Sequence, residues 1–364
     1  MIRISEPVIG DAEEKLVLEV LRSGRLVQGP MVERFEESVR EAVGAAEAIA
    51  VNNGTSALVA ALQAHGVGRG DEAILPPFTF VATLNALLQV GATPRFADIG
   101  SDFNIDPESL ERVISPTTRV VMPVHLYGLP SDLAAIRATA EQVGALVIED
   151  AAQALGAAVD GVSIGATGTS CFSFYATKIL TTGEGGLVAT DDPLVAEHLR
   201  ILRNQGQRDR YDYAFVGHNY RMTELQAALG VAQMGRMSEL IEQRRINATE
   251  LTERLQGVDG LVLPRELPGR LHVYHQYTVR VTAEARLARD ALAERLRAHG
   301  IECGVYYPRP VFDYPCFRHD PRLGNPHVPE AVLASGQVLS LPVHPALDAH
   351  DIDRISSLVR QELS

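Results

Sequence analysis

Apolar positions follow two different periods in the first 200 residues of this 364-residue chain. Three or four residues separate each apolar position from the next in the series Val32, Phe35, Val39 and Val43. This spacing is typical of a helix with one buried face. Short apolar runs bounded by turn residues predict buried strands at 48–51, 74–75, 119–124 and 145–149. Because strands alternate with helices, the pattern predicts a mostly parallel sheet with helices on both faces.

The pattern changes after residue 222. Two long helices are predicted at 222–235 and 238–256. The remaining chain predicts a strand, an Ala- and Arg-rich amphipathic helix, a second strand and a last helix, at 273–281, 283–299, 338–343 and 350–361. We therefore expect a large domain at 1–236, which includes the N-terminal helix, and a smaller α/β domain at 237–364 that is reached through the helix 238–256.

Composition narrows the class of function. Hydrophobic residues make up 46% of the chain and charged residues 22%, as in ordinary globular proteins, and the length suits two domains. The net charge of −13 argues against nucleic acid or an anionic membrane surface as the main partner. No signal pattern and no apolar run of about 18 residues is present, and three cysteines cannot all pair, so we expect a cytoplasmic protein with reduced thiols.

Lysine is rare in this chain, which draws attention to Lys178. Of 33 basic residues only two are lysines, and Lys178 lies between an aromatic strand and a glycine cluster in CFSFYATKILTTGEGG. Arginine serves equally well for surface charge, but a guanidinium is not deprotonated and forms no Schiff base. The alternative is a surface lysine without chemistry, which is how we interpret Lys15. The segments around Lys178 favour chemistry.

Asp150 ends the apolar run ALVIE, where a buried strand gives way to a loop. That position is the carboxyl edge of an α/β sheet, where ligands bind. Capping of the next helix is the alternative role for such an acid. Pyridoxal 5'-phosphate requires a lysine for its aldehyde and an acid that keeps its ring nitrogen protonated, and Lys178 and Asp150 together supply both.

The segment VNNGTSALVAALQAHG is a candidate phosphate site. A short strand and a Gly turn precede Thr55 and Ser56, which open an apolar helix whose free N–H groups and positive dipole end favour an anion. Thr55 is also a good N-cap, and most such turns bind nothing. Ser173, two residues before Tyr175 in the strand that leads to Lys178, strengthens the phosphate interpretation.

These segments resemble the DegT family (DegT/DnrJ/StrS) of fold-type I, pyridoxal-phosphate-dependent aminotransferases, which aminate keto sugars and cyclitols. The similarity covers nearly the whole chain in order: SGRLVQGP (23–30), NNGTSALVAAL (52–62), PPFTFVATLNALL (76–88), PRFADI to NIDP (94–107), PVHLYGLP (123–130), IEDAAQALGA (148–157), the Lys178 segment and GHNYRMTELQAAL (217–229). The resemblance implies a mostly parallel seven-stranded sheet flanked by helices, with a smaller C-terminal α/β domain.

The resemblance assigns residues to the cofactor ring. It implies that Lys178 binds the cofactor covalently and then acts as the base that moves a proton, and that Asp150 pairs with the pyridine nitrogen. Gln153 is expected near the 3-hydroxyl of the ring. Phe80 is expected to stack on the ring face, with Phe78 as the second choice. From the sequence alone, a core aromatic residue is the alternative role of Phe80.

The resemblance also assigns the phosphate site and the assembly. Three residues are expected to bind the phosphate: Thr55, Ser56 and Ser173. Asn219, in the NYRM motif, is expected to reach the phosphate of the neighbouring subunit. The active unit is therefore expected to be a homodimer with shared active sites. The scattered histidines show no spacing of a helical zinc site, and we expect no metal ion.

The implied reaction is transamination, with glutamate as the amine donor, 2-oxoglutarate as its product and a nucleotide-linked keto sugar as the acceptor. The segment TTGEGG after Lys178 resembles members that aminate C4 of 4-keto-6-deoxy sugars, whereas members acting at C3 more often read GALGDGG. Three alternative functions remain open: a C3 keto-sugar aminotransferase, a cyclitol aminotransferase and a cofactor-binding regulatory protein. The absence of a DNA-binding segment or basic tail favours an enzyme.

A nucleotide diphosphate needs local cations in an acidic protein. The candidates are three arginines interleaved with tyrosines, namely Arg208, Arg210, Arg221, Tyr211, Tyr213 and Tyr220. The alternative is a solvated loop at a dimer edge. A second loop, PRPVFDYPCF (308–317), has Phe312 where many relatives have His, so sugar recognition from it is expected to differ. We interpret His125 and His218 as structural.

Overall fold

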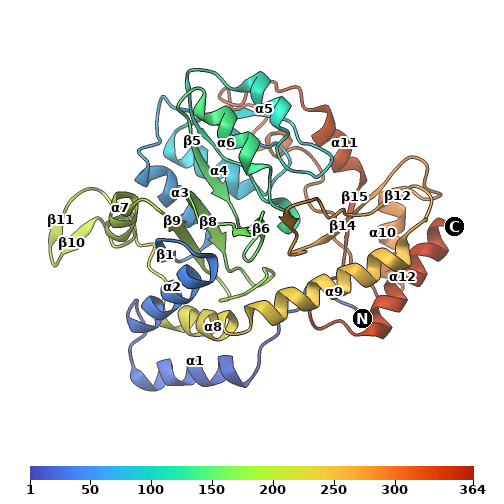
Figure 1. Ribbon diagram of the computed structural model, residues 1–364, viewed down its shortest axis with the longest axis horizontal. Helices are drawn as coiled ribbons and strands as arrows, with labels where there is room; N and C mark the ends of the chain where they lie inside the picture. The colour runs from blue at the N-terminus through green and yellow to red at the C-terminus, as the bar shows by residue number, and fades with distance from the viewer.

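The computed structural model describes residues 1–364 and has a seven-stranded sheet at its centre (Figure 1). The strand order is β1-β9-β8-β5-β4-β2-β3. The bounds are β1 Glu47–Val51, β2 Glu72–Leu75, β3 Thr93–Phe96, β4 Thr118–Val121, β5 Leu146–Asp150, β8 Thr169–Ser173 and β9 Gly186–Thr190. Only β9 runs antiparallel to its neighbours. The predicted mostly parallel, seven-stranded sheet is confirmed.

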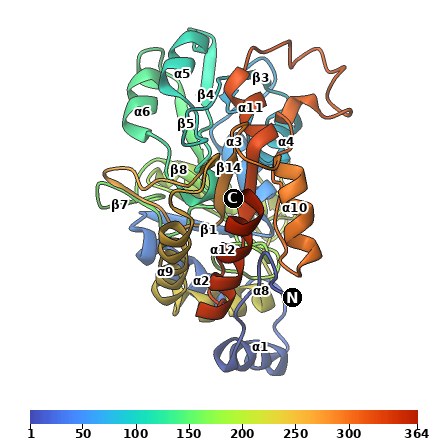
Figure 2. The same ribbon diagram turned by 90° about the vertical axis from the view of Figure 1, so that its right-hand side faces the viewer.

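Helices cover both faces of this sheet (Figure 2). Their bounds are α1 Asp11–Ser23, α2 Pro30–Val43, α3 Gly54–Ala64, α4 Val81–Val90, α5 Pro107–Val113, α6 Leu133–Glu141, α7 Pro193–Arg203 and α8 Glu224–Met234. Successive strand residues point to opposite faces. On β1, Ile49 and Val51 therefore join the core formed with α3, α4 and α7, while Ala48 and Ala50 join the core formed with α2 and α8. A further cluster lies beneath α5 and α6.

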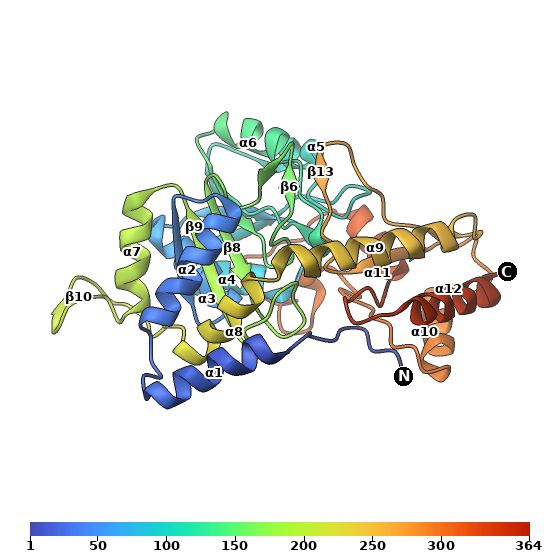
Figure 3. The same cartoon turned by 60° about the horizontal axis from the view of Figure 1, so that its bottom comes forward.

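The C-terminal part forms a second, three-stranded sheet in the order β12-β14-β15. Its elements are α9 Met237–Leu255, β12 Leu261–Val262, β14 Tyr277–Val281, α10 Arg289–Ala298, α11 Pro329–Gln337, β15 Val338–Leu341 and α12 Ala349–Leu363. Helix α9 connects the two cores (Figure 3): Leu240 and Ile241 belong to the α2–α8 core, whereas Leu251 and Leu255 belong to the core of the smaller sheet. The domain boundary between residues 236 and 237 stays a prediction.

Two predicted C-terminal elements begin later than expected. The strand predicted at 273–281 starts at Tyr277, because Tyr274 has φ 46° and its ring stacks on His272 with 3.9 Å between ring centroids. The helix predicted at 283–299 starts at Arg289, because the Ala285 N–H closes a turn on the Thr282 carbonyl. Periodicity indicated both element types but extended them into irregular backbone.

Several short elements were not predicted. They are β6 Ala158–Val159, β7 Val162–Ser163, β10 Gln207–Asp209, β11 Asp212–Tyr213, β13 Arg270–Leu271 and two short 3-10 helices, Leu126–Gly128 and Val311–Asp313. Strands of two or three residues carry too few side chains to show a period. The pair β10–β11 forms a hairpin that projects from the body of the protein (Figure 1). None of the helices combines the length and the apolar character needed to cross a membrane.

Candidate active site

The segments that the sequence singled out meet at one edge of the large sheet. Strands β1, β5 and β8 are parallel, and they end at Val51, Asp150 and Ser173. Carboxyl ends of parallel strands share an edge, where α/β proteins bind ligands. The loops that follow these strands line a cavity of about 900 Å³, which we call the main cavity. This volume lies at the upper end of the usual range for ligand pockets.

The N-terminus of α3 forms one wall of the main cavity. The cap is Asn53, whose side-chain oxygen accepts the Ser56 N–H at 2.8 Å, so the alternative role of Thr55 as N-cap is wrong. The N–H groups of Gly54 and Thr55 belong to the first turn, where a helix offers no acceptor. With the positive end of the helix dipole, they form an anion-binding wall.

Close backbone approach brings Ser173 to this wall. A Cβ added to Gly54 would lie 2.8 Å from the Ser173 Cβ, so the first turn of α3 and the end of β8 are in contact only because Gly54 has no side chain. The three residues predicted to bind phosphate all line the main cavity: Thr55, Ser56 and Ser173. The structure therefore brings the predicted phosphate residues together.

Asp150 is the last residue of β5 and is 4% exposed. Its carboxylate accepts the Thr83 hydroxyl at 2.8 Å and the Ala152 N–H at 3.1 Å, and it forms no ion pair with a basic side chain. No helix begins after it, so the alternative role of helix cap is wrong. Burial raises the pKa of Asp150, while these two hydrogen bonds oppose the rise. A buried acid without a cation partner fits a cationic ring nitrogen.

Lys178 lines the main cavity in the turn after β8, where its N–H bonds to the Tyr175 carbonyl at 2.9 Å. Burial lowers the pKa of its ammonium group to about 8, although the Asp150 carboxylate acts in the opposite direction. At pH 7 roughly a tenth of the group is therefore free amine, far more than for a lysine with the ordinary pKa. Lys15, in contrast, is exposed on α1, as the surface interpretation predicts.

Two residues predicted to contact the ring, Phe80 and Gln153, line the main cavity. Phe80 precedes α4, is 58% exposed and lines the main cavity, whereas Phe78 is fully buried against Tyr127 and Tyr307. The core interpretation therefore applies to Phe78. Gln153 is held by two hydrogen bonds, because its Oε1 accepts the Tyr127 N–H at 2.9 Å and its Nε2 donates to the Tyr307 hydroxyl at 3.1 Å.

Sequence reasoning missed the contribution of the C-terminal part to this cavity. The missed lining residues are His275, Gln276, Tyr306 and Tyr307. His275 is 6% exposed, its Nδ1 has no hydrogen-bond partner, and burial together with the nearby Lys178 charge lowers its pKa. The available signal was the cluster of His and Tyr in HVYHQY, which we interpreted only as strand alternation.

Asn219 is exposed and does not line the main cavity of its own chain. Its backbone pairs with Asn204, next to the hairpin β10–β11. Of the arginine and tyrosine patch, only Tyr220 reaches the cavity. Arg221 donates to the Asn204 Oδ1 at 3.0 Å, and the Arg210 guanidinium lies 5.4 Å from the ring centre of its neighbour Tyr211.

Three further side chains singled out in the sequence lie outside the main cavity. His125 is fully buried, donates through Nε2 to Glu149 at 3.1 Å and accepts the Ser131 N–H on Nδ1 at 3.0 Å. His218 stacks on Tyr220. These contacts support the structural interpretation of both histidines. Phe312 packs on Phe96, with 4.9 Å between ring centroids.

Comparison with known proteins agrees with this geometry. Residues 7–360 match the model of the DegT/DnrJ/EryC1/StrS aminotransferase family. The chain is 40% identical, over 90% of its length and 88% of the relative, to a pleiotropic regulatory protein of Geobacillus stearothermophilus. It is 38% identical, over 95% and 92% of the two chains, to a UDP-N-acetyl-3-dehydro-alpha-D-glucosamine 3-aminotransferase of Acidithiobacillus ferrooxidans.

Among solved structures, the crystal structure of DesV from S. venezuelae in complex with a ketimine intermediate superimposes with a TM-score of 0.91. It is 38% identical and covers 96% of this chain and 93% of its own. Both the sequence match and the superposition extend over nearly the whole protein, so the predicted fold-type I architecture is confirmed. The chain belongs to the DegT/DnrJ/EryC1/StrS family of pyridoxal-phosphate-dependent sugar aminotransferases.

Proposed function

We propose that this protein binds pyridoxal 5'-phosphate and transfers the amino group of glutamate to a nucleotide-linked keto sugar. The observation that carries the proposal is that Lys178, Asp150 and the N-terminus of α3 meet in one cavity of about 900 Å³. When bound, the cofactor supplies an aldehyde that condenses with amines and a ring that withdraws electrons from the bond being broken. The residues of the main cavity meet the requirements of that group.

The phosphate fits the α3 wall. The N–H groups of Gly54 and Thr55 have no acceptor within the helix, and the hydroxyls of Thr55, Ser56 and Ser173 line the same space. Fixed N–H and O–H donors bind phosphate oxygens strongly because the acceptor is ionised. A side chain at position 54 would close the approach to Ser173, which explains the glycine there.

Asp150 and Lys178 have complementary tasks. Asp150 would accept the hydrogen of a protonated ring nitrogen, and the Thr83 hydroxyl and the Ala152 N–H fix the position of its carboxylate. Lys178 would hold the aldehyde of the cofactor as a free amine, and its released amine would serve as the base that moves a proton. Its lowered pKa of about 8 suits both tasks near neutral pH.

For the acceptor, we propose a 4-keto-6-deoxy hexose linked to a nucleotide. Glu184 of the TTGEGG segment lines the main cavity, so this segment faces the space available to the sugar. The segment resembles that of C4-acting members. Amination at C3 is the second candidate, because the Acidithiobacillus relative is named as a 3-aminotransferase. We further propose that two chains share each site, with Asn219 completing the phosphate site of the partner.

A panel of nucleotide-linked 3-keto and 4-keto sugars, each supplied with glutamate and cofactor, tests this proposal. We expect 2-oxoglutarate and an amino sugar from a 4-keto substrate, with the new C–N bond located by NMR. Amination of a 3-keto sugar alone would move the reaction to C3 and leave the aminotransferase assignment intact. Failure with every keto sugar, by a protein that retains its cofactor, would contradict the proposed substrate class.

A further inference from the structure

Gln153, the residue expected beside the 3-hydroxyl of the cofactor ring, is held from two distant parts of the chain. Its Oε1 accepts the N–H of Tyr127, in the short 3-10 helix that follows β4, at 2.9 Å. Its Nε2 donates to the hydroxyl of Tyr307, which belongs to the C-terminal part, at 3.1 Å. A backbone N–H can only donate, so the Tyr127 contact identifies the oxygen end of the amide. The Nε2 end therefore meets Tyr307, and its second hydrogen has no acceptor within the protein.

Tyr307 lies on a segment that connects the smaller sheet to the large one. Near one end of this segment, Gly304 exchanges two backbone hydrogen bonds with Ser340 of β15, at 3.0 and 2.8 Å. Near the other end, the Val311 N–H donates to the carbonyl of Pro77, which follows β2 of the large sheet, at 2.7 Å. The Tyr307 hydroxyl is thus a contact that the C-terminal part makes with the expected ring site.

The position of the Tyr307 ring is closely determined. The ring packs edge-on against Phe78 and stacks with Tyr127, with 5.5 and 6.1 Å between ring centroids. Tyr307 has φ 59° and Tyr127 has φ 58°, a backbone region that residues with a side chain rarely adopt. Such conformations persist only where the surroundings hold them, and they gather at functional sites. Burial raises the pKa of Tyr307, so its hydroxyl stays uncharged and accepts the Gln153 hydrogen.

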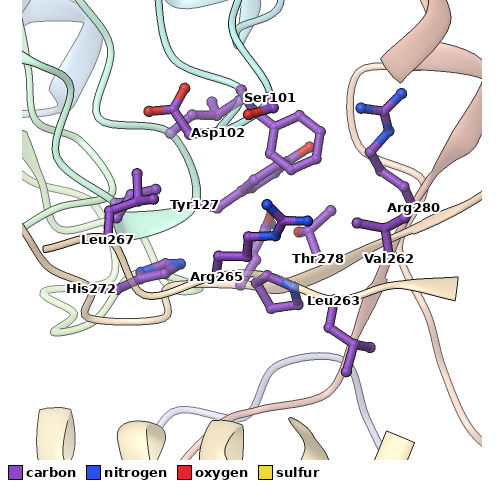
Figure 4. Close-up of a pocket in the computed structure, with 15 residues that line it drawn as sticks. Ser101, Asp102, Tyr127, Val262, Leu263, Arg265, Leu267, His272, Thr278 and Arg280 are labelled. Atoms are coloured by element: carbon purple, nitrogen blue, oxygen red, sulfur yellow. The ribbon is translucent and has the colours of Figure 1, made fainter. Parts of the chain in front are cut away.

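The other side of Tyr127 is hollow. Its carbonyl accepts the Gln276 N–H at 3.2 Å, which is a further bond to the C-terminal part. Next to it lies a cavity of about 240 Å³, lined by the loops at 101–103 and 126–129 on one side and by residues between 262 and 280 on the other (Figure 4). Because side chains do not fill this space, the contacts on the opposite side of Tyr127 carry more of the connection between the two parts.

We propose that Tyr307 is a positioning residue for the cofactor ring, because its hydroxyl holds the Gln153 amide in the orientation that offers the second Nε2 hydrogen to the 3-oxygen of the ring. This role rests on the proposed function, since it requires the cofactor in the main cavity. A hydrogen bond to an ionised oxygen favours the ionised form. Loss of the Tyr307 hydroxyl should therefore raise the pKa of the 3-hydroxyl of the bound cofactor.

The test compares Tyr307→Phe, Gln153→Ala and the double variant. Cofactor-free protein is titrated with pyridoxal 5'-phosphate, and the visible absorbance of the bound cofactor is followed against pH. Tyr307→Phe removes only the hydroxyl and keeps the ring that packs on Phe78. We expect it to weaken cofactor binding about threefold, as for the loss of one neutral hydrogen bond, and to raise the pH midpoint of the absorbance change by about half a unit.

The double variant shows whether Tyr307 acts through Gln153. In the Gln153→Ala background, Tyr307→Phe should change neither the affinity nor the midpoint further. The matched control is Tyr277→Phe, which removes a fully buried hydroxyl that is bonded to Thr252 at 2.8 Å in the core of the smaller sheet. This control should leave both values as in the unchanged protein.

A crystal structure of cofactor-free Tyr307→Phe adds a readout that does not depend on the cofactor. We expect the aromatic ring to stay in place and the Gln153 amide to leave its present position. An unmoved amide, an unchanged pH midpoint in Tyr307→Phe, or an equal shift with and without Gln153 would each overturn the proposal while the unchanged protein still binds the cofactor. No cofactor binding by the unchanged protein would instead overturn the proposed function, and this role of Tyr307 with it.

Discussion

Asp150 and Lys178 share one cavity, and burial acts on both in the direction of the uncharged form. It raises the pKa of Asp150 and lowers that of Lys178 to about 8. For Lys178, the neutral amine is the reactive form. For Asp150, a cationic ring nitrogen provides the partner that favours the carboxylate. The two shifts therefore prepare one residue to react and the other to receive a positive charge.

Replacing Asp150 with Asn tests its role. Asn keeps the size but removes the charge that holds a ring nitrogen protonated, so we expect bound cofactor to persist while kcat falls at least about 100-fold, roughly 2.7 kcal/mol in activation free energy. Steady-state kinetics and the cofactor absorbance measure the two effects. Asp259→Asn, at an exposed loop position, is the control. Near-normal kcat in Asp150→Asn would remove Asp150 from the mechanism.

The lowered pKa of Lys178 predicts the pH dependence of cofactor attachment. Only the free amine attacks the aldehyde, and its fraction rises as the pH increases through the pKa. We expect the rate of covalent attachment to cofactor-free enzyme to rise with pH and to level off above about 8, rather than to keep rising toward the ordinary value of 10.5. Stopped-flow absorbance measures this rate. A midpoint near 10.5 would mean that the cavity does not desolvate Lys178.

At the level of elements, the junction between β1 and α3 sets the geometry of the proposed phosphate site. Gly54 opens α3, Asn53 caps it, and the first turn of the helix lines the main cavity. The approach of Ser173 depends on the missing Cβ at position 54. Position 54 is therefore where the smallest possible change should have a large effect.

Gly54→Ala should weaken cofactor binding at least tenfold. The added methyl group would lie 2.8 Å from the Ser173 Cβ, a contact that forces the helix N-terminus and β8 apart. Gly336→Ala, in helix α11 with open space around it, is the matched control and should bind the cofactor as the unchanged protein does. Titration of cofactor-free protein, followed by absorbance, gives the affinities. If Gly54→Ala and the control bound the cofactor with equal affinity, the N-terminus of α3 would have no role in phosphate binding.

The elements also show which parts of the site and fold could be predicted from sequence patterns. Lys178, Asp150 and the 52–56 turn were found because each lies in a contiguous segment with a strong local period or an unusual residue. His275 and Tyr307 were missed because they reach the main cavity only through the packing of the C-terminal part, which no local period encodes. The late start of α10 has the same cause, since the turn at 282–285 overrides helical composition.

At the level of the whole molecule, the hairpin β10–β11 and Asn219 are exposed and lie outside the cavity of their own chain (Figure 1). A projecting hairpin with exposed tyrosines, among them Tyr211 at 74% exposure, is suited to contact a second chain. We expect a homodimer in which each active site takes Asn219 from the partner.

Mixing an inactive Lys178→Ala chain with an impaired Asn219→Ala chain tests the shared site. In a hybrid of Lys178→Ala and Asn219→Ala chains, one site carries both changes and the other carries neither. Equal concentrations with free exchange give about half hybrid dimers by statistics, so activity should clearly exceed the average of the two variants. Co-expression ensures exchange, and native mass spectrometry confirms the hybrids. The test requires that Asn219→Ala alone is impaired and that hybrids are present. Activity equal to the average of the two variants would then mean that each chain builds its own site.

The most direct test of the proposed chemistry uses the scarcity of lysine. Borohydride reduction of the cofactor-loaded protein fixes the cofactor on the lysine that holds it, and peptide mapping by mass spectrometry identifies that residue. The chain offers only Lys15 and Lys178. We expect the label on Lys178, and its loss in Lys178→Arg. A label on Lys15, or no label with cofactor in excess, would contradict the assignment of the main cavity as the active site.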